Sequence, residues 1–152
     1  MNVRKLDMQN SIGTVILLAS KSLERAAEQE IGRKLGLTPS QWKVILALNM
    51  FDDLTQKELA GKIYVDGSTL VPVIDKMESS GLIERRADQH DRRQNRLRLT
   101  KKAEGTVDSI NREIMRLRKS IYAGISEGEM ESLRKVLQKM IDNAGRMTKA
   151  KA

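Results

Sequence analysis

Apolar residues recur every three or four positions along most of the chain, which is the spacing of one face of an α-helix. The pattern predicts a long helix over about residues 8–34, a second over 39–50, a short third over 56–63 and a fourth over 68–80. The fourth carries the apolar set of a one-sided helix: Leu70, Val73, Ile74 and Met77. Gly81 follows it, and glycine accepts the left-handed conformation that commonly ends a helix.

Helix start signals support three of the predicted boundaries. Each is a capping box, in which a Ser or Thr is followed three residues later by Glu or Gln. They lie at 38–41, where a proline also occupies the first helical position, at 55–58 and at 126–129. In each box a side-chain oxygen can satisfy a backbone N–H that the first helical turn leaves without a partner.

The period changes after Gly81. Residues 82–86 are typical of a short strand, and residues 96–99 alternate polar and apolar as a half-buried strand does. The polar segment 88–95 lies between them. We therefore expect a β-hairpin with a long, charged loop.

Two more helices are predicted near the C-terminus, and their apolar residues recur with heptad-like spacing. The first set is Ala103, Val107, Ile110, Ile114, Leu117 and Ile121, and the second is Met130, Leu133, Leu137, Met140, Ala144 and Met147. Together with the helix over 8–34 they offer more apolar surface than one small module can cover. A homodimer is therefore expected.

The order of a short helix, a turn, a one-sided helix and a hairpin is that of a winged helix-turn-helix. The predicted fold class is mainly α, a winged helix-turn-helix with N- and C-terminal dimerisation helices. In such a module the second helix enters the major groove of double-stranded DNA, and the hairpin reaches the flanking backbone or the minor groove.

The net positive charge of the chain favours a polyanionic binding partner. The 152 residues carry a net charge of +8. Between positions 84 and 102 there are eight basic and three acidic residues, so the hairpin region accounts for +5 of that surplus. A basic hairpin is where a DNA-binding wing needs positive charge.

Composition argues against several other classes. The chain has no cysteine and one histidine, which argues against disulfides, thiol chemistry and histidine-rich metal sites. It contains no phosphate loop, dinucleotide fingerprint or nucleophile–base pair. We therefore expect no enzyme activity and no cofactor. No apolar run approaches the ~18 residues of a membrane span, and no secretory signal is present, so a soluble cytoplasmic protein is expected.

At this point the sequence resembles the MarR (multiple antibiotic resistance regulator) family over nearly its whole length. The most specific segments are 81–85, 91–93 (Asp-Arg-Arg) and 97–100, with support from 54–60 and 70–78. The resemblance implies a single domain over 1–152. Within it, a winged helix occupies about 38–100, and dimerisation helices occupy about 8–35 and 101–147.

The resemblance also implies an obligate dimer of triangular shape, whose two winged helices each bind half of a palindromic operator. Many members are repressors that small anionic or phenolic ligands release. Effector pockets in such dimers leave no local motif, so the effector-binding residues stay unknown. The alternative is a winged helix that mainly contacts protein, or that packages DNA without sequence preference.

In the wing, the resemblance places Arg93 in the minor groove, with Asp91 holding its guanidinium in place. A flat, weakly hydrated cation suits a narrow groove. Arg92 either binds phosphate or pairs with an acid. His90 is expected to be an exposed residue without a special role.

In the two helices of the motif, one of Ser68 and Thr69 is expected to cap the recognition helix, the predicted helix over 68–80, while the other donates to phosphate. The alternative is that their role is capping alone. Lys76 is expected to neutralise a phosphate from the exposed flank. Gln56 and Lys57 are expected to contact backbone phosphates at the start of the preceding helix.

Val71 and Pro72 occupy likely reading positions of the recognition helix. They cannot hydrogen-bond a base edge, but either can contact a thymine methyl group, and proline also removes an N–H from the helix. Asp75 faces outward, where it would repel phosphate, so we predict that a hairpin arginine neutralises it. Trp42 is expected in the core rather than on a ligand platform.

Overall fold

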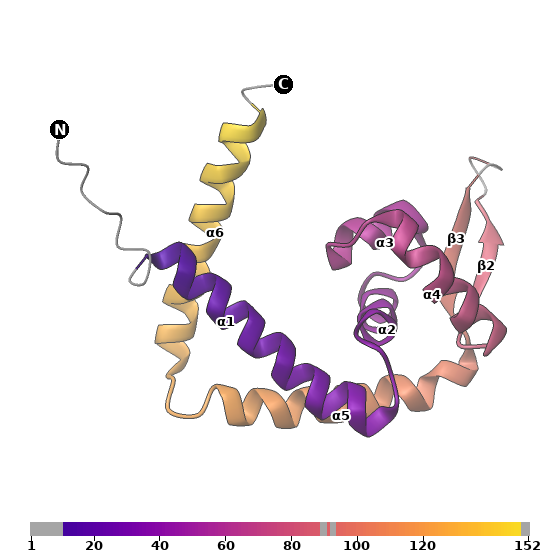
Figure 1. Ribbon diagram of the computed structural model, residues 1–152, viewed down its shortest axis with the longest axis horizontal. Helices are drawn as coiled ribbons and strands as arrows, with labels where there is room; N and C mark the ends of the chain where they lie inside the picture. The colour runs from indigo at the N-terminus through magenta and orange to yellow at the C-terminus, as the bar shows by residue number, and fades with distance from the viewer. Residues whose placement is uncertain (1–10, 89–90, 92–93, 150–152) are drawn as a thin grey trace. The chain divides into compact units, whose positions relative to one another are not determined.

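The computed structural model describes residues 11–88, 91 and 94–149, and Figure 1 traces their course. The chain forms two compact units, Met1–Leu117 and Arg118–Ala152. The helices of the first unit are α1 (Ile12–Ala27), η1 (Glu28–Arg33), α2 (Pro39–Phe51), α3 (Gln56–Ile63), α4 (Gly67–Ser79) and the short η2 (Lys101–Ala103). Helix α5 (Glu104–Ile121) crosses the boundary between the units, and α6 (Glu127–Lys149) lies in the second.

The helix boundaries agree closely with the sequence-based expectation, and the capping boxes account for much of that agreement. At α2 and α3, the side chains of Thr38 and Thr55 accept hydrogen bonds from the backbone N–H three residues on. At α6 the Ser126 hydroxyl oxygen accepts from the N–H of Glu129, at 3.3 Å. The expected start of the N-terminal helix at about residue 8 lies outside the described residues, and its last turns form the π-helical segment η1.

A small antiparallel sheet completes the first unit. Its strands are β1 (Leu54–Thr55), β2 (Ile83–Ala87) and β3 (Asn95–Leu99), in the order β1-β3-β2. The hairpin is the predicted one, with strand ends shifted by one residue. Strand β1 was not expected: it is two residues long, too short for an alternating pattern, and it exists because Leu54 and Thr55 pair with Leu97 and Arg96.

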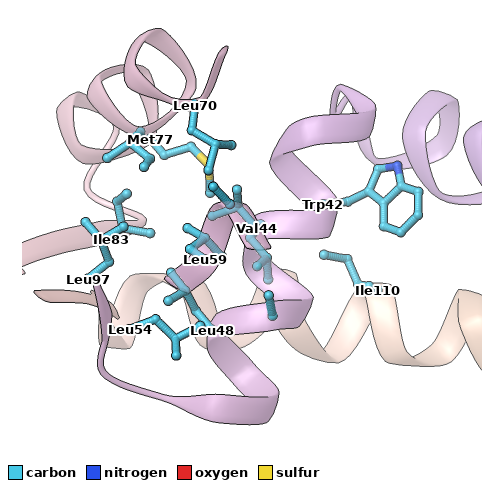
Figure 2. Packing of buried hydrophobic residues seen from close by; sticks show 14 of the residues in the cluster. Trp42, Val44, Leu48, Leu54, Leu59, Leu70, Met77, Ile83, Leu97 and Ile110 are labelled. Carbon is cyan, nitrogen blue, oxygen red and sulfur yellow. The ribbon is translucent and has the colours of Figure 1, made fainter. Parts of the chain in front are cut away.

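The core of the first unit lies where α2, α3 and α4 meet the hairpin, as Figure 2 shows. Leu59, Leu70 and Met77 are fully buried there, beside Ile83 and Leu97 of the hairpin. Ile110 brings α5 into the same cluster. The fold is therefore mainly helical with a three-stranded antiparallel sheet, and the expected winged helix-turn-helix is confirmed.

Two helices keep much of their apolar surface exposed within the chain. On α1, Ile12, Val15, Leu17 and Leu18 are each at least 50% exposed. On α6, no residue from Glu127 to Met147 is buried, and Leu133, Val136 and Ile141 are more than half exposed. Within its own unit, each of these helices therefore leaves an apolar face exposed among the described residues. Across the described ranges, no helix combines the length and the apolar character needed to cross a membrane.

Candidate nucleic-acid interface

Helix α4 presents one face to the core and the opposite face to solvent. Leu70, Ile74 and Met77 are buried. The positions of this helix that the sequence placed on its outward side are all exposed: Ser68, Thr69, Val71, Pro72, Asp75 and Lys76. The buried and exposed positions thus alternate with the helical period, and two of the exposed side chains, Val71 and Pro72, are apolar.

The start of α4 corrects one expectation. Its N-cap residue is Asp66, and no side chain caps the first turn. Ser68 and Thr69 lie inside that turn, so the prediction that one of them caps the helix is wrong. Their exposed hydroxyl groups are consequently not committed to a cap.

Pro72 lies inside α4 rather than at its first position. A proline at this depth has no N–H to donate to the carbonyl four residues earlier, which is that of Ser68. The helix nevertheless continues to Ser79. Buried apolar residues on both sides of Pro72, namely Leu70 and Ile74, hold the helix against the core.

Arg85 of β2 neutralises Asp75, which confirms the prediction that a hairpin arginine does so. The Arg85 Nη2 atom donates to Asp75 Oδ1 at 2.5 Å, and Nη1 forms an ion pair with Glu78, one turn further along α4. Burial acts to lower the pKa of Arg85, but the hydrogen bonds to Asp75 and Glu78 outweigh it and raise that pKa above its usual value. Arg85 therefore ties the hairpin to the recognition helix.

The start of α3 lies beside α4. Gln56, which the sequence predicts to contact phosphate, is half-buried. Its Nε2 atom donates to the Gly67 carbonyl at 3.2 Å, so its side chain joins α3 to the start of α4. Lys57 is exposed. Both residues line a surface hollow of about 390 Å³, which Arg85, Gln94 and Asn95 border from the hairpin side.

Two arginines of β3, Arg96 and Arg98, bind acceptor atoms in the turn before α3. Arg96 donates from Nε to Asp88 Oδ2 at 2.5 Å and from Nη1 to the Asp53 carbonyl at 2.6 Å. Arg98 donates from Nε to Asp53 Oδ1 at 2.9 Å. The hydrogen bond to Asp88 is the largest cause that raises the pKa of Arg96, and the bond to Asp53 is the largest for Arg98.

These ion pairs change the interpretation of the basic hairpin. Arg85 and Arg98 pair with acids that lie outside the segment 84–102 over which the charge was counted. Arg96 pairs with Asp88, which that count includes only as a negative charge and not as a partner. Sequence reasoning missed Asp53, Glu78 and Asp88 as partners. For Asp53 no local signal exists, because 43 positions separate it from Arg96.

In the hairpin loop, Asp91 is among the described residues and forms two hydrogen bonds. Its backbone N–H donates to Asp88 Oδ1 at 3.1 Å, and its Oδ2 atom accepts from Gln94 Nε2 at 2.9 Å. Arg92, Arg93 and His90 lie outside the described residues. The expected contact between Asp91 and Arg93 therefore stays a prediction.

A second hollow, of about 710 Å³, opens between α1 and the α2–α3 pair. Trp42 is 9% exposed, which confirms its place in the core, and its ring also borders the hollow. Its Nε1–H is buried and has no hydrogen-bond partner among the residues that the structure describes. On the same wall, Lys62 Nζ lies 4.1 Å from the Phe51 ring centroid, and Lys43 Nζ donates to Glu24 Oε1 at 2.8 Å. That bond lowers the pKa of Glu24.

Among the residues that the structure describes, no group of three or more His, Cys, Asp or Glu side chains could hold a metal ion. The surfaces that carry the predicted DNA contacts are the exposed face of α4, the start of α3 and the hairpin. All three belong to the winged helix.

Comparisons with known proteins identify this module. The family model of the MarR family matches residues 37–94. The crystal structure of transcriptional regulator PA3341 is 31% identical, with a TM-score of 0.83, and the match covers 90% of this chain and 99% of that one. The chain is also similar to the transcriptional repressor CouR bound to a 23-mer DNA duplex, at 20% identity and a TM-score of 0.76, over 93% of this chain and 99% of that one.

A third similar structure is the PcaV transcriptional regulator from Streptomyces coelicolor in complex with its natural ligand. It is 20% identical, with a TM-score of 0.74, and the match covers 91% of this chain and 97% of that one. The match to the family model and the identity to PA3341 along nearly the whole chain lead to one conclusion. The chain belongs to the MarR family of transcriptional regulators.

Proposed function

We propose that this regulator is a repressor that binds a palindromic operator in double-stranded DNA as a homodimer and leaves it when a small ligand binds. The observation that carries the proposal is the recognition helix α4, whose outward residues are all exposed while Arg85 fixes it to the hairpin. Such a repressor works where its DNA is, so we propose a cytoplasmic location.

In this proposal the hydroxyl groups of Ser68 and Thr69 donate to phosphate at the edge of the major groove. Val71 and Pro72 contact thymine methyl groups, because neither side chain can hydrogen-bond a base edge. Lys76 neutralises a phosphate. Recognition at these positions would then favour A·T pairs through apolar contact.

The remaining DNA contacts come from the elements on either side of α4. Lys57, which is exposed, and Gln56 contact phosphates from the start of α3. Arg93 enters the minor groove with Asp91 as its support, and Arg92 contacts the flanking backbone.

The homodimer is supported by the apolar faces that α1 and α6 each leave exposed within their own unit. We propose that the segments about 8–35 and 101–147 form the dimer body and that about 38–100 forms the DNA-binding winged helix. Two recognition helices would then lie about one DNA turn apart, ~34 Å. The similar repressor CouR bound to a 23-mer DNA duplex supports the DNA-binding part of this proposal.

The hollow between α1 and the α2–α3 pair is the candidate effector pocket. Its volume of about 710 Å³ suits a small molecule. The Lys62 ammonium group favours a ligand oxygen, and the rings of Trp42 and Phe51, which also line the hollow, favour an apolar or aromatic body. A small anionic or phenolic ligand satisfies all three, and the similar regulator PcaV has a natural ligand.

DNA selection tests the proposal. The dimer should enrich a palindromic duplex from a random-sequence library and bind it about 10³-fold or more tightly than a scrambled duplex at physiological salt. Equal affinity for the two duplexes would instead favour a protein that packages DNA without sequence preference, a reading to which Val71 and Pro72 give some weight. A promoter carrying the selected duplex should be less active when the protein is present.

Ligand binding can be followed directly, because Trp42 is the only tryptophan of the chain. Aromatic carboxylates that quench its fluorescence should also weaken binding to the selected duplex, and Lys62→Met should reduce both effects. Lys139→Met, on exposed surface of α6, is the control. Ligands that quench Trp42 but leave DNA affinity unchanged would contradict the release mechanism.

A further inference from the structure

Asp88 is a buried carboxylate where the hairpin loop leaves β2, and its side chain is 6% exposed. Its Oδ2 atom accepts from Arg96 Nε at 2.5 Å and its Oδ1 atom accepts from the Asp91 N–H at 3.1 Å. Its own N–H donates to the Gln94 carbonyl at 3.0 Å. A buried charge is tolerated only when it is paired and hydrogen-bonded, so the conformation of this end of the loop depends on Arg96.

Arg96 also reaches outside the hairpin. Its Nη1 atom donates to the Asp53 carbonyl at 2.6 Å and lies 4.0 Å from Glu58 Oε2. Glu58 is the acidic member of the capping box that starts α3, where its Oε2 atom accepts from the Thr55 N–H at 2.8 Å. One guanidinium group therefore joins the base of the hairpin loop to the first turn of α3.

The turn that receives Arg96 has an unusual backbone. Asp52 and Asp53 have φ of 41° and 53°, values that L-residues seldom adopt and that persist when the surroundings hold them. Arg96 binds the carbonyl of Asp53, and Arg98 binds its carboxylate. The two arginines thus hold the turn and the hairpin to each other.

We propose that Arg96 is a positioning residue for DNA binding: through Asp88 and Asp53 it fixes the hairpin to the start of α3, so that the wing and the recognition helix meet DNA as one unit. The inference rests on the proposed DNA-binding function. Arg85 makes the corresponding link from the hairpin to α4. The hairpin is then attached to both helices of the motif by arginines that are not themselves DNA contacts.

The competing explanation is that Arg96 contacts phosphate directly and that Asp88 only adds unfavourable negative charge. The two explanations predict opposite signs for Asp88→Asn. Removing an anion near DNA strengthens binding if only charge matters. It weakens binding if Asp88 and Arg96 set the position of the wing.

The hairpin provides matched controls. Arg86 is the direct cross-strand neighbour of Arg96, and it pairs with Glu84 of the same strand at 2.5 Å, so this ion pair lies within the hairpin. Arg86→Met removes the same charge as Arg96→Met. Glu84→Gln removes the same charge as Asp88→Asn.

The experiment measures affinity for the duplex that the wild-type protein selects from a random library, together with hydroxyl-radical footprints. Asp88→Asn and Arg96→Met should each weaken binding roughly tenfold or more, the loss expected when a groove contact is released. The footprint should fade at the flanks, where the wing lies, and persist at the recognition-helix positions. The double variant should bind no more weakly than either single variant, because both act through one contact.

Arg86→Met should weaken binding only a few-fold, and Glu84→Gln should leave it unchanged or tighter. If Arg96→Met fails to fold because Asp88 loses the guanidinium group that pairs with it, Asp88→Asn and the double variant still decide the question. Asp88→Asn that binds as tightly as wild type, or a uniform fading of the footprint, would overturn the inference. A wild-type protein that selects no duplex would overturn the proposed function first, and this inference with it.

Discussion

Arg85 lies between two carboxylates of the recognition helix, and this placement decides what the outward face of that helix presents to DNA. Asp75 is 57% exposed as a side chain, and Arg85 is 24% exposed. Without the guanidinium, Asp75 and Glu78 would face phosphate as two unpaired anions. The sequence predicted that a hairpin arginine neutralises Asp75, because the helical period turns Asp75 outward.

The first prediction concerns this pair. Arg85→Met should weaken binding to selected and scrambled duplexes alike, because it adds net negative charge near phosphate. It should lower the free energy of unfolding by about 1 kcal/mol, since the ion pairs are partly exposed. Gel-shift titration and urea denaturation measure the two effects.

The matched control is Arg85→Met combined with Asp75→Asn and Glu78→Gln, which removes both unpaired carboxylates. It should recover most of the lost affinity for the scrambled duplex. Full affinity in Arg85→Met alone would mean that Asp75 does not approach phosphate.

At the scale of the element, Pro72 leaves helix α4 with one hydrogen bond fewer than a regular helix has. Pro72→Ala supplies an N–H to the Ser68 carbonyl, and alanine is the residue that helices tolerate best. The free energy of unfolding should therefore rise, by roughly 1–3 kcal/mol. Urea denaturation measures it.

Lys76→Ala, exposed on the same helix, should change the free energy of unfolding by less than about 0.5 kcal/mol. If Pro72→Ala stabilises the protein but costs affinity for the selected duplex, the proline side chain contributes to recognition. An unchanged or lower stability would mean that the backbone at Pro72 deviates from the α-helical path that alanine would need.

Glu58 gives a prediction about pH. Hydrogen bonds from the Thr55 backbone and hydroxyl group, with a further contribution from the charge of Arg96, lower the pKa of Glu58 below its ordinary value of 4.5. A carboxylate whose pKa is lowered by folding stabilises the protein above its unfolded-state pKa, and that stabilisation disappears as the pH falls through the folded-state pKa.

Wild type should therefore be more stable than Glu58→Gln at about pH 7, and the difference should shrink toward about pH 3. Thermal unfolding at a series of pH values measures it. Glu129→Gln, in the capping box of α6, should behave in the same way, because the hydrogen bonds from Ser126 lower the pKa of Glu129. A difference that stays constant across this range would contradict the role of the charged carboxylate.

The elements also separate what the sequence can predict from what it cannot. Helix boundaries and the hairpin are predictable because apolar period and capping boxes are local signals. Strand β1 is not, since Leu54 and Thr55 extend only to pair with β3. The roles of Arg96 and Arg98 are not predictable either, because their partner Asp53 lies more than 40 positions away. From their position in the sequence, these arginines are expected to be part of a basic wing. In the folded chain they instead pair with Asp88 and Asp53.

For the whole molecule, this pairing lowers the charge available to DNA. The hairpin region carries a surplus of +5 in the sequence, but its arginines form ion pairs with four acids of neighbouring elements, which lowers the positive charge that these side chains present. Those acids are Asp53, Glu58, Asp75 and Glu78. A count of arginines alone would therefore overestimate the contribution of charge to DNA affinity. Specific contacts and the joining of two winged helices must supply the remainder of that affinity.

Joining two winged helices requires the dimer, and the apolar faces of α1 and α6 provide its driving force. Helices with this many exposed large apolar side chains are uncommon in monomeric proteins. We predict that the protein sediments with twice the mass of the chain and that its Tm rises with protein concentration, because association stabilises the folded state. A charge placed in the apolar face of α6, as in Ile141→Glu, should shift sedimentation toward the monomer and abolish the concentration dependence of Tm.

Lys139→Glu is the matched control, because it places a glutamate on the same helix at an exposed polar position. It should leave the dimer intact. Ile141→Glu should also lose most of its affinity for a palindromic duplex while keeping weak affinity for a half-site, since each monomer retains a complete winged helix. An Ile141→Glu protein that remains dimeric would show that α6 lies outside the interface, and the same substitution at Leu17 would then test whether α1 alone forms it.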